Sequence, residues 1–312
     1  MYWAELRPAE AGRSVIVRHR DGGTQDVLPA PFSARTTVHE YGGGAFLAIS
    51  GRVFFSNSAD NAVYELESAG PRRLTSTGSQ VRFADMVLDR RRNRLIAVAE
   101  DHTRDPVRNE LRAISLDDGS IETVQRGHDF YAAPRISPDG ATLAWLQWDF
   151  PNMPWDGTTL CTGALDARGA VHDVRAVAGG SEESVLQPGW SAEGSLHYVS
   201  DATGWWNVYR LEPGGPRNLL PDALDCGVPP WTFGDSTYAF LDDRQIAIAG
   251  ARNGLWELHV VDAMSGDARP VNLPFSDIDG YVRATKGRIA LVAGSGISPL
   301  GVVLVDPASG AA

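Results

Sequence analysis

The chain has 312 residues, of which 43% are hydrophobic and 21% are charged, and its formal net charge is -11. A chain of this length and composition can bury a large core without support from metals or disulfides. The negative charge and the lack of a stripe of Lys and Arg argue against nucleic acid and anionic membrane surfaces as partners.

The N-terminal residues, the apolar runs and the cysteines bear on the cellular location of the protein. The first residues, MYWAELRPAEAGR, lack the apolar stretch of a signal peptide, and no apolar run reaches the length of a membrane span. Cys161 and Cys226 lie far apart and are predicted to be free thiols. The basic run at residues 90–92 falls in a turn and is predicted to be a solvated loop. These features predict a cytoplasmic protein.

Short apolar or alternating runs recur along the chain, each of strand length and bounded by Gly, Pro, Asp or Ser. In chain order, the predicted strands cover residues 14–19, 45–50, 52–57, 62–67, 94–101, 142–149, 195–201, 207–212, 238–243, 245–251, 255–262, 288–294 and 301–306. Helical periodicity is hard to find. The sequence therefore predicts an all-β protein.

A weak internal repeat of strand, tight turn and strand organises these runs. Its clearest copies are PRISPDGATLAWLQWD at residues 134–149 and PGWSAEGSLHYVSD at residues 188–201. The mean spacing of the turns is about 47 residues, which is typical of a four-stranded propeller blade. The turn markers are Gly51, Asn93, Gly140, Gly194, Ser236 and Gly287. We expect a β-propeller of about seven blades, the first without its inner strand and the last without its outer strand.

Several joined segments resemble the N-terminal β-propeller of prolyl oligopeptidase family serine peptidases. They are YWAELRPAEAGRSVIVRH, VHEYGGGAF, RVFFSNSADNAVYELE, HDFYAAPRISPDGATLAWLQWDFPNMPWDGTTL, SDATGWWNVYRLE and VPPWTFGDSTYAFL. The nearest branch resembles bacterial acylaminoacyl-peptidases and dipeptidyl-aminopeptidase-like proteins. HEYGGG and NMPWDGT are the more specific parts, since many propellers contain SPDG. The resemblance implies a TolB-like or dipeptidyl-peptidase-like propeller.

The resemblance also implies an α/β-hydrolase domain after the propeller, with a Ser-Asp-His triad and a G-x-S-x-G motif. This chain contains no G-x-S-x-G. We therefore expect one propeller domain over residues 1–312, with the catalytic domain absent, no catalytic residue and no cofactor. Residues 234–236, GDS, are predicted to form a turn of the repeat rather than a nucleophile elbow. No His-x-His or His-Glu-x-x-His spacing predicts a metal site.

The resemblance implies that the propeller allows only short peptides to reach the active site. It also implies that the propeller can present carboxylates to the free amino group of a peptide. HEYGGG at residues 39–44 precedes a predicted innermost strand, where glycines allow backbones to approach closely. Glu40, with His39 and Tyr41, is therefore a candidate for substrate binding. A structural bond from Glu40 to another blade, for example to Arg35, is the alternative. Glu182 and Glu183 form a rival acidic pair in a loop between blades, and a solvated loop is their default interpretation.

The loop PNMPWDG at residues 151–157 is predicted between the second and third strands of a blade. Loops carry function more often than core strands do. Asn152, Met153, Trp155 and Asp156 are candidates for contact with either the hydrolase domain or the substrate. Trp148 is instead expected to pack between blades.

The predicted function is a non-catalytic propeller that controls substrate access to a peptidase for short peptides. Its partners would be the hydrolase domain, short peptides and, as in many members of the family, further copies of the chain. A stand-alone propeller that binds peptides or proteins is the main alternative. A propeller enzyme of the lactonase or glycosidase kind would need a metal cluster or a carboxylate pair at the channel mouth.

Overall fold

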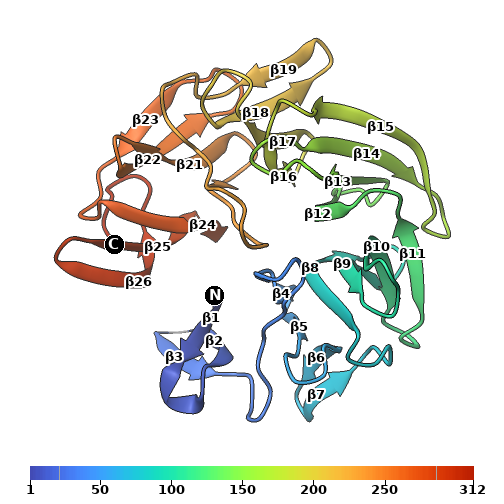
Figure 1. The fold of residues 1–312 in the computed structure, drawn as a ribbon. Coiled ribbons are helices and arrows are strands. Elements are labelled where there is room, and N and C mark those ends of the chain that lie inside the picture. The colour runs from blue at the N-terminus through green and yellow to red at the C-terminus, as the bar shows by residue number, and fades with distance from the viewer. Residues whose placement is uncertain (21, 286) are drawn as a thin grey trace.

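The computed structural model describes residues 1–20, 22–285 and 287–312. Its strands form seven separate antiparallel sheets around a common axis, as the blades of a propeller (Figure 1). Five sheets have four strands, and the first and last have three. The structure confirms the predicted all-β propeller with seven blades and three-stranded sheets at both ends.

Consecutive strands pair in each sheet, so every blade is a meander. Blade 1 contains β1 (Tyr2–Arg7), β2 (Arg13–Arg20) and β3 (Gly23–Asp26). Blade 2 contains β4 (Phe46–Ile49), β5 (Arg52–Ser56), β6 (Val63–Glu67) and β7 (Gly70–Arg73). Blade 3 contains β8 (Val81–Asp89), β9 (Arg94–Asp101), β10 (Arg108–Ser115) and β11 (Ile121–Gln125). Blade 4 contains β12 (Phe130–Ile136), β13 (Thr142–Trp148), β14 (Thr159–Leu165) and β15 (Val171–Gly179).

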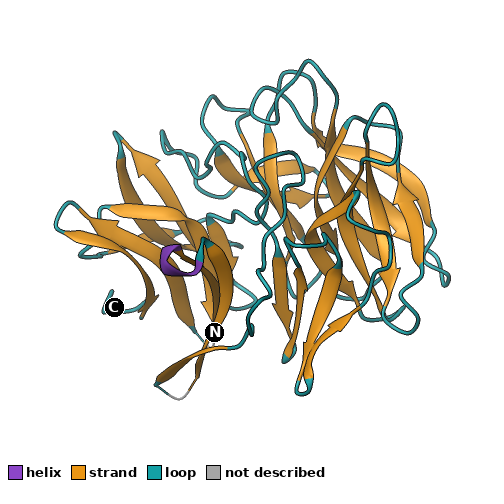
Figure 2. Ribbon diagram, turned by 60° about the horizontal axis from the view of Figure 1, so that its bottom comes forward, coloured by secondary structure: helices purple, strands orange, loops and turns teal. Residues whose placement is uncertain are grey.

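The remaining blades repeat this order. Blade 5 contains β16 (Val185–Trp190), β17 (Leu196–Ser200), β18 (Asn207–Glu212) and β19 (Gly215–Asn218). Blade 6 contains β20 (Tyr238–Phe240), β21 (Gln245–Arg252), β22 (Leu255–Asp262) and β23 (Ala268–Val271). Blade 7 contains β24 (Asp277–Thr285), β25 (Arg288–Ser295) and β26 (Ser298–Val305). The short turn η1 (Pro8–Glu10) is the one helical element among the described residues (Figure 2). None of the described helices is long and apolar enough to cross a membrane.

The second strand of a blade shows why these sequences form this fold. All eight residues of β9 are buried, whereas β3 is exposed along its whole length. A second strand has a neighbouring blade on each of its two faces, so an apolar run without alternation suits it. The outermost strands meet solvent and carry the polar residues.

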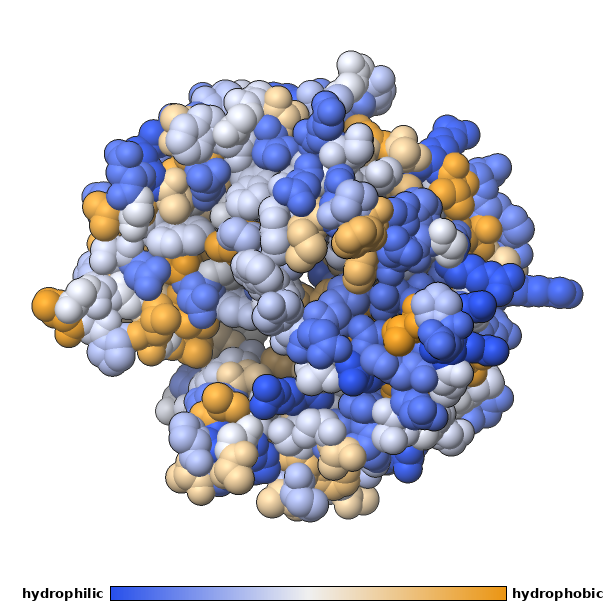
Figure 3. Space-filling view, viewed as in Figure 1, coloured by the Kyte–Doolittle hydropathy of each residue, from blue (hydrophilic) through white to orange (hydrophobic). Residues whose placement is uncertain are grey.

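Six hydrophobic clusters hold the blades together, and each lies between two successive blades. The cluster around Trp145 joins blades 3 and 4, and the one around Tyr198 joins blades 4 and 5. The others join blades 1 and 2, 2 and 3, 5 and 6, and 6 and 7. Among the described residues, no cluster joins blades 7 and 1. The molecular surface is hollowed between these two blades, at the left of Figure 3.

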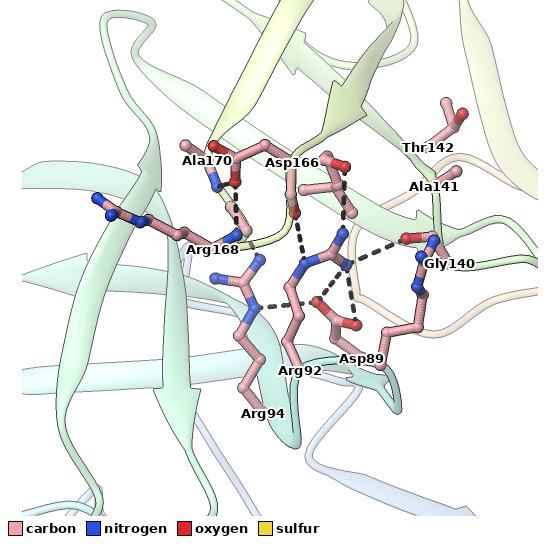
Figure 4. A network of polar contacts seen from close by, with 12 residues as sticks. Asp89, Arg92, Arg94, Gly140, Ala141, Thr142, Asp166, Arg168 and Ala170 are labelled. Atoms are coloured by element: carbon pink, nitrogen blue, oxygen red, sulfur yellow. Dashed lines mark hydrogen bonds and ion pairs between the residues drawn. The ribbon is translucent and has the colours of Figure 1, made fainter.

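A polar network joins blades 3 and 4 at the turn between β8 and β9 (Figure 4). The Asp89 carboxylate is fully buried and lies 3.1 Å from the Arg92 guanidinium and 3.0 Å from that of Arg94. Both arginines also donate hydrogen bonds to backbone carbonyls of blade 4. The prediction of a solvated loop at residues 90–92 is therefore wrong for Arg92, whose side chain is only 8% exposed.

Four innermost strands, β8, β12, β16 and β24, have a bulge in their pairing with the second strand, and in blades 3 and 5 the bulge bonds to the next blade. Asp85 and Gln187 stand at bulges with φ of 50° and 52°. The Asp85 carboxylate accepts a hydrogen bond from the Ala133 amide (2.8 Å), and the Gln187 side-chain oxygen accepts one from the Thr237 amide (2.8 Å). The bulges thus direct side chains toward the following blade.

One turn marker was wrongly placed. Ser236 does not lie between the first two strands of blade 6, because that turn is at residues 241–244. Ser236 instead precedes β20 and forms an isolated bridge with Tyr281 of blade 7. The Gly and Ser of the GDS stretch are typical of a turn, but here they belong to the long connection from β19 to β20, which reaches toward the axis (Figure 1).

Candidate functional site

The HEYGGG segment turns sharply before β4. The Glu40 amide donates to the Thr37 carbonyl (3.0 Å), and the Gly42 amide donates to the Val38 carbonyl (3.0 Å). His39 and Glu40 have φ of 53° and 69°, in the left-handed region that non-glycine residues seldom adopt. The segment is therefore a tight turn that aims three side chains in different directions.

The glycines that follow let this segment meet the connection to blade 6, nearly opposite blade 2 in the ring. Gly43 pairs with Phe233 as a parallel bridge, and the Phe233 amide donates to the Gly42 carbonyl (2.8 Å). A Cβ atom on Gly43 would lie 2.5 Å from the Phe233 carbonyl oxygen and 2.6 Å from its amide nitrogen. Two connections thus touch across the channel mouth, both reaching toward the centre of Figure 1.

His39 is enclosed by aromatic rings from other segments. Its ring centroid lies 5.1 Å from that of Phe130, 5.7 Å from Trp148 and 4.9 Å from Phe233. Burial lowers the pKa of His39 to about 4, against an opposing effect of the Glu100 carboxylate. The neutral ring packs as part of the structure. Trp148 also stacks on Phe130, its partner within blade 4.

The Glu40 carboxylate points to solvent, with 79% of its side chain exposed. It lies 3.5 Å from the Arg82 guanidinium, which is closer to Glu100, at 2.8 Å. The cationic partner of Glu40 is thus Arg82 rather than Arg35. Arg35 lines a separate polar cleft of about 540 Å³ between blades 1 and 2.

The loop from β13 to β14 and the connection from β15 to β16 are bonded together. The Asn152 side-chain amide donates to the Ser181 carbonyl (2.8 Å), and the Ser184 hydroxyl donates to the Pro154 carbonyl (2.8 Å). The Thr158 amide donates to the Glu183 carbonyl (3.0 Å). These bonds place the candidate residues of both segments, including the exposed Met153, Asp156 and Glu182, on one surface.

Glu183 differs from Glu182 in its surroundings. Glu182 is exposed, whereas Glu183 is half-buried and accepts a hydrogen bond from the Ser200 hydroxyl (2.6 Å). Burial raises the pKa of the nearby Asp201, and the Glu183 carboxylate raises it further, although the Ser184 amide opposes both. Among the described residues, no Lys or Arg nitrogen lies within 4 Å of the Glu183 or the Asp201 carboxylate. Glu183 and Asp201 are therefore a pair of acids without a cationic partner in the part of the chain that the structure describes.

Aromatic ring contacts connect the surface formed by these two segments to the HEYGGG segment. The Trp231 ring centroid lies 5.1 Å from that of Tyr41 and 4.4 Å from that of Trp155. Trp231 and Asp201 were missed as site residues, because only the folding of distant segments shows what they contact. An aromatic residue in a Pro-Pro-Trp loop was the one available signal for Trp231.

A second polar group is formed by Asp235, in the connection before β20, and by Asp279 and Arg283 on the innermost strand β24. Burial raises the pKa of Asp235 to about 7, and the Asp279 carboxylate adds to this rise while Arg283 opposes it. The Arg283 guanidinium donates to the Gly234 carbonyl (2.7 Å). Burial lowers the pKa of Arg283, and so does the neighbouring Arg135, although water still reaches its side chain. Arg283 is thus partly surrounded by other residues and remains in contact with water.

Two further predictions concern metal and thiol chemistry. In residues 1–20, 22–285 and 287–312, no group of three or more His, Cys, Asp or Glu side chains could hold a metal ion. Cys161 and Cys226 are free, as predicted, and both are buried. Burial raises the pKa of the Cys161 thiol to about 11 and that of Cys226 to about 12. Neither thiol is suited to act as a nucleophile.

No protein-family model matches the chain, and no curated protein sequence matches it significantly. Among solved structures, it is similar to a puromycin-hydrolyzing peptidase of Mycobacterium tuberculosis, with 34% identity and a TM-score of 0.92. A puromycin hydrolase gives 33% identity and a TM-score of 0.91. Both matches cover 99% of this chain and 50% of the other, so the chain spans about half the length of these relatives. Prolyl oligopeptidase B from Galerina marginata, at 12% identity and a TM-score of 0.67, shares the fold alone, over 99% of this chain and 47% of its own.

Proposed function

Since the chain belongs, through its β-propeller, to the prolyl oligopeptidase family of peptidases, we propose that it is the non-catalytic half of such an enzyme. In this role it would control which substrates reach a hydrolase domain and would hold the free amino group of a short peptide. The relatives are about twice as long as this chain, which supports a second, catalytic part. The reaction itself would be the cleavage of aminoacyl or acyl-aminoacyl bonds by that part.

One observation carries the proposal: Glu183 and Asp201 are adjacent and partly buried carboxylates without a cation among the described residues. Removing charge from water is unfavourable unless an opposite charge compensates it. An ammonium group would supply that charge and form strong hydrogen bonds to both carboxylates. Glu183 is therefore the residue that we expect to hold the amino group.

Glu40 takes a lesser part in this proposal. Arg82 already lies near its carboxylate, and most of the side chain is in water. An ion pair at such an exposed position contributes little. We propose that Glu40 adds to the negative potential at the mouth, as does the exposed Glu182, while Glu183 makes the direct contact.

The control of access rests on the two connections that touch across the mouth. Gly43 and Phe233 are in backbone contact, and His39 fills the space beneath them with aromatic rings around it. This packing fills part of the mouth, which supports the proposed exclusion of folded proteins. A cytoplasmic location is also part of the proposal and is supported by the two free thiols.

Peptide binding to this chain tests the proposal directly. Ala-Gly-Gly with a free amino group and its N-acetyl form would be titrated in parallel by calorimetry. We expect only the free amine to bind, and we expect Glu183→Gln to weaken it about 10- to 100-fold, the range for a hydrogen bond to a charged group. Glu193→Gln, at an exposed position in the β16–β17 turn of the same blade, is the matched control. Equal binding of the acetylated peptide would contradict the proposal.

A further inference from the structure

Three aromatic side chains at the channel mouth have no part in the proposed function so far. Tyr41 is 63% exposed and Trp231 is 49% exposed, and Trp155 is half-buried beside them. The Trp231 ring lies between the other two, at 5.1 Å from Tyr41 and 4.4 Å from Trp155. We call these three residues the aromatic cluster. Large rings that remain this exposed often mark a binding surface.

The three residues of the aromatic cluster come from three separate connections. Tyr41 is in the connection into blade 2, Trp155 is in a loop within blade 4, and Trp231 is in the connection into blade 6. Each connection is fixed by its own contacts. Tyr41 stands next to the glycines that pair with Phe233, and the Trp231 amide donates to the Pro229 carbonyl (2.8 Å). In the loop of Trp155, the Met153 amide donates to the Asp156 carboxylate (2.9 Å). The connections that carry the rings are therefore ordered by their own contacts, and the rings contact one another.

The charges around the cluster favour a cationic ligand. Glu40 is the immediate neighbour of Tyr41, and the exposed Asp156 is that of Trp155. Arg82 is the cation near Glu40, and it is shared with the buried Glu100. Aromatic faces attract cations, and the surrounding carboxylates add to this attraction.

The cluster is also bonded to the acidic pair. The Thr158 amide donates to the Glu183 carbonyl (3.0 Å), and the Ser184 hydroxyl donates to the carbonyl of Pro154, the residue before Trp155. A ligand whose ammonium group lies at Glu183 therefore has the aromatic cluster within the same surface. The first residue of a peptide carries its ammonium group and its side chain on one carbon atom.

We propose that the aromatic cluster binds the side chain of a peptide's amino-terminal residue and selects aromatic side chains there. The inference rests on the proposed function, because it places the ammonium group of the same residue at Glu183. An aromatic ring would pack on the exposed faces of Trp231 and Tyr41, edge-on or offset, as such rings prefer. The ligand is thus a short peptide with a free amino group and an aromatic first residue.

The test compares two peptides with free amino groups, Phe-Gly-Gly and Ala-Gly-Gly, by calorimetry on the 312-residue chain. We expect Phe-Gly-Gly to bind about tenfold more tightly, as the packing of one ring pair with its buried area suggests. Trp231→Ala should remove this preference, and Trp205→Ala should keep it. Trp205 is 43% exposed and makes no ring contact among the described residues, so it is a matched control. The indole NMR signals of Trp155 and Trp231 should shift with Phe-Gly-Gly.

The outcomes separate the two levels of the proposal. If the free amine binds better than the acetylated peptide but Phe-Gly-Gly binds no better than Ala-Gly-Gly, the aromatic selection is wrong and the amine site stands. If Trp231→Ala leaves the preference intact, the cluster is not the binding surface. Unshifted indole signals with saturating peptide would show that the bound peptide does not contact these rings, which would contradict the inference. Because Trp231 is exposed, we expect Trp231→Ala to keep the urea midpoint of the parent chain, which makes a loss of preference interpretable.

Discussion

Replacing Gly43 by Ala should disturb the contact that closes the channel mouth. Gly43 has φ of 86°, where Ala is disfavoured by about 1–2 kcal/mol. The new Cβ would also meet the backbone of Phe233 at 2.5 and 2.6 Å. Backbone atoms cannot rotate away as a side chain can, so overpacking should add about 1–3 kcal/mol. The free energy of unfolding should fall by about 2–5 kcal/mol in total.

Gly51→Ala is the matched control for this change. Gly51 has φ of 78° in the turn between β4 and β5, and a Cβ there would meet nothing within 4 Å. Gly51→Ala should therefore lower the free energy of unfolding only by the conformational penalty, about 1–2 kcal/mol. Urea unfolding followed by both tryptophan fluorescence and circular dichroism measures the difference, provided that the two probes coincide. Equal losses for the two variants would refute the idea that Gly43 is required for close approach across the mouth.

Two other substitutions test the buried charges. Asp89→Ala should destabilise the chain by about 3–5 kcal/mol, because Arg92 and Arg94 would remain buried without their carboxylate. Glu67→Ala, which removes an exposed ion pair, should cost about 0–1 kcal/mol in the same urea assay, and a similar loss for both would contradict this reasoning. Asp235 keeps its proton up to about pH 7 in the folded state but only to its usual pKa of 3.8 when unfolded, so its contribution to stability is lost as pH rises through this window. Asp235→Asn should therefore have the same free energy of unfolding as the parent chain near pH 3 and a value about 2–4 kcal/mol higher at pH 8. If the two curves of unfolding free energy against pH run parallel, the Asp235 carboxyl does not have a raised pKa.

The repeat in the sequence was sufficient to predict the number of blades, because each blade is a local unit of consecutive strands. Gly140 and Gly194 mark real turns, since a tight hairpin needs particular residues at fixed positions. Ser236 misled for the same reason: the GDS stretch is typical of a turn but occurs in a connection whose conformation depends on blade 7. Residue types at fixed spacing predict a turn within one blade, but they do not predict a conformation that depends on contacts with a distant segment.

The candidate site shows the same limit. HEYGGG and PNMPWDG stand out in the sequence, and the structure brings them onto one surface. The ring that connects them, Trp231, and the acid beside Glu183, Asp201, could not be selected in advance, because their roles depend on contacts between blades. Arg92 was misjudged because a basic run in a turn is usually solvated, whereas here Asp89 holds it inside.

Among the described residues, the hydrophobic clusters join blades 1 to 7 in sequence and none joins blade 7 to blade 1, so a terminal blade shares one such cluster where an internal blade shares two. A blade that buries less apolar surface against its neighbours opens locally at a lower free-energy cost. Amide hydrogen exchange should then be slowest in the middle blades and faster toward blades 1 and 7. The most protected part would be blades 3 to 5, which carry Glu183 and the loop of Trp155, so the proposed binding surface would persist while the terminal blades open and close.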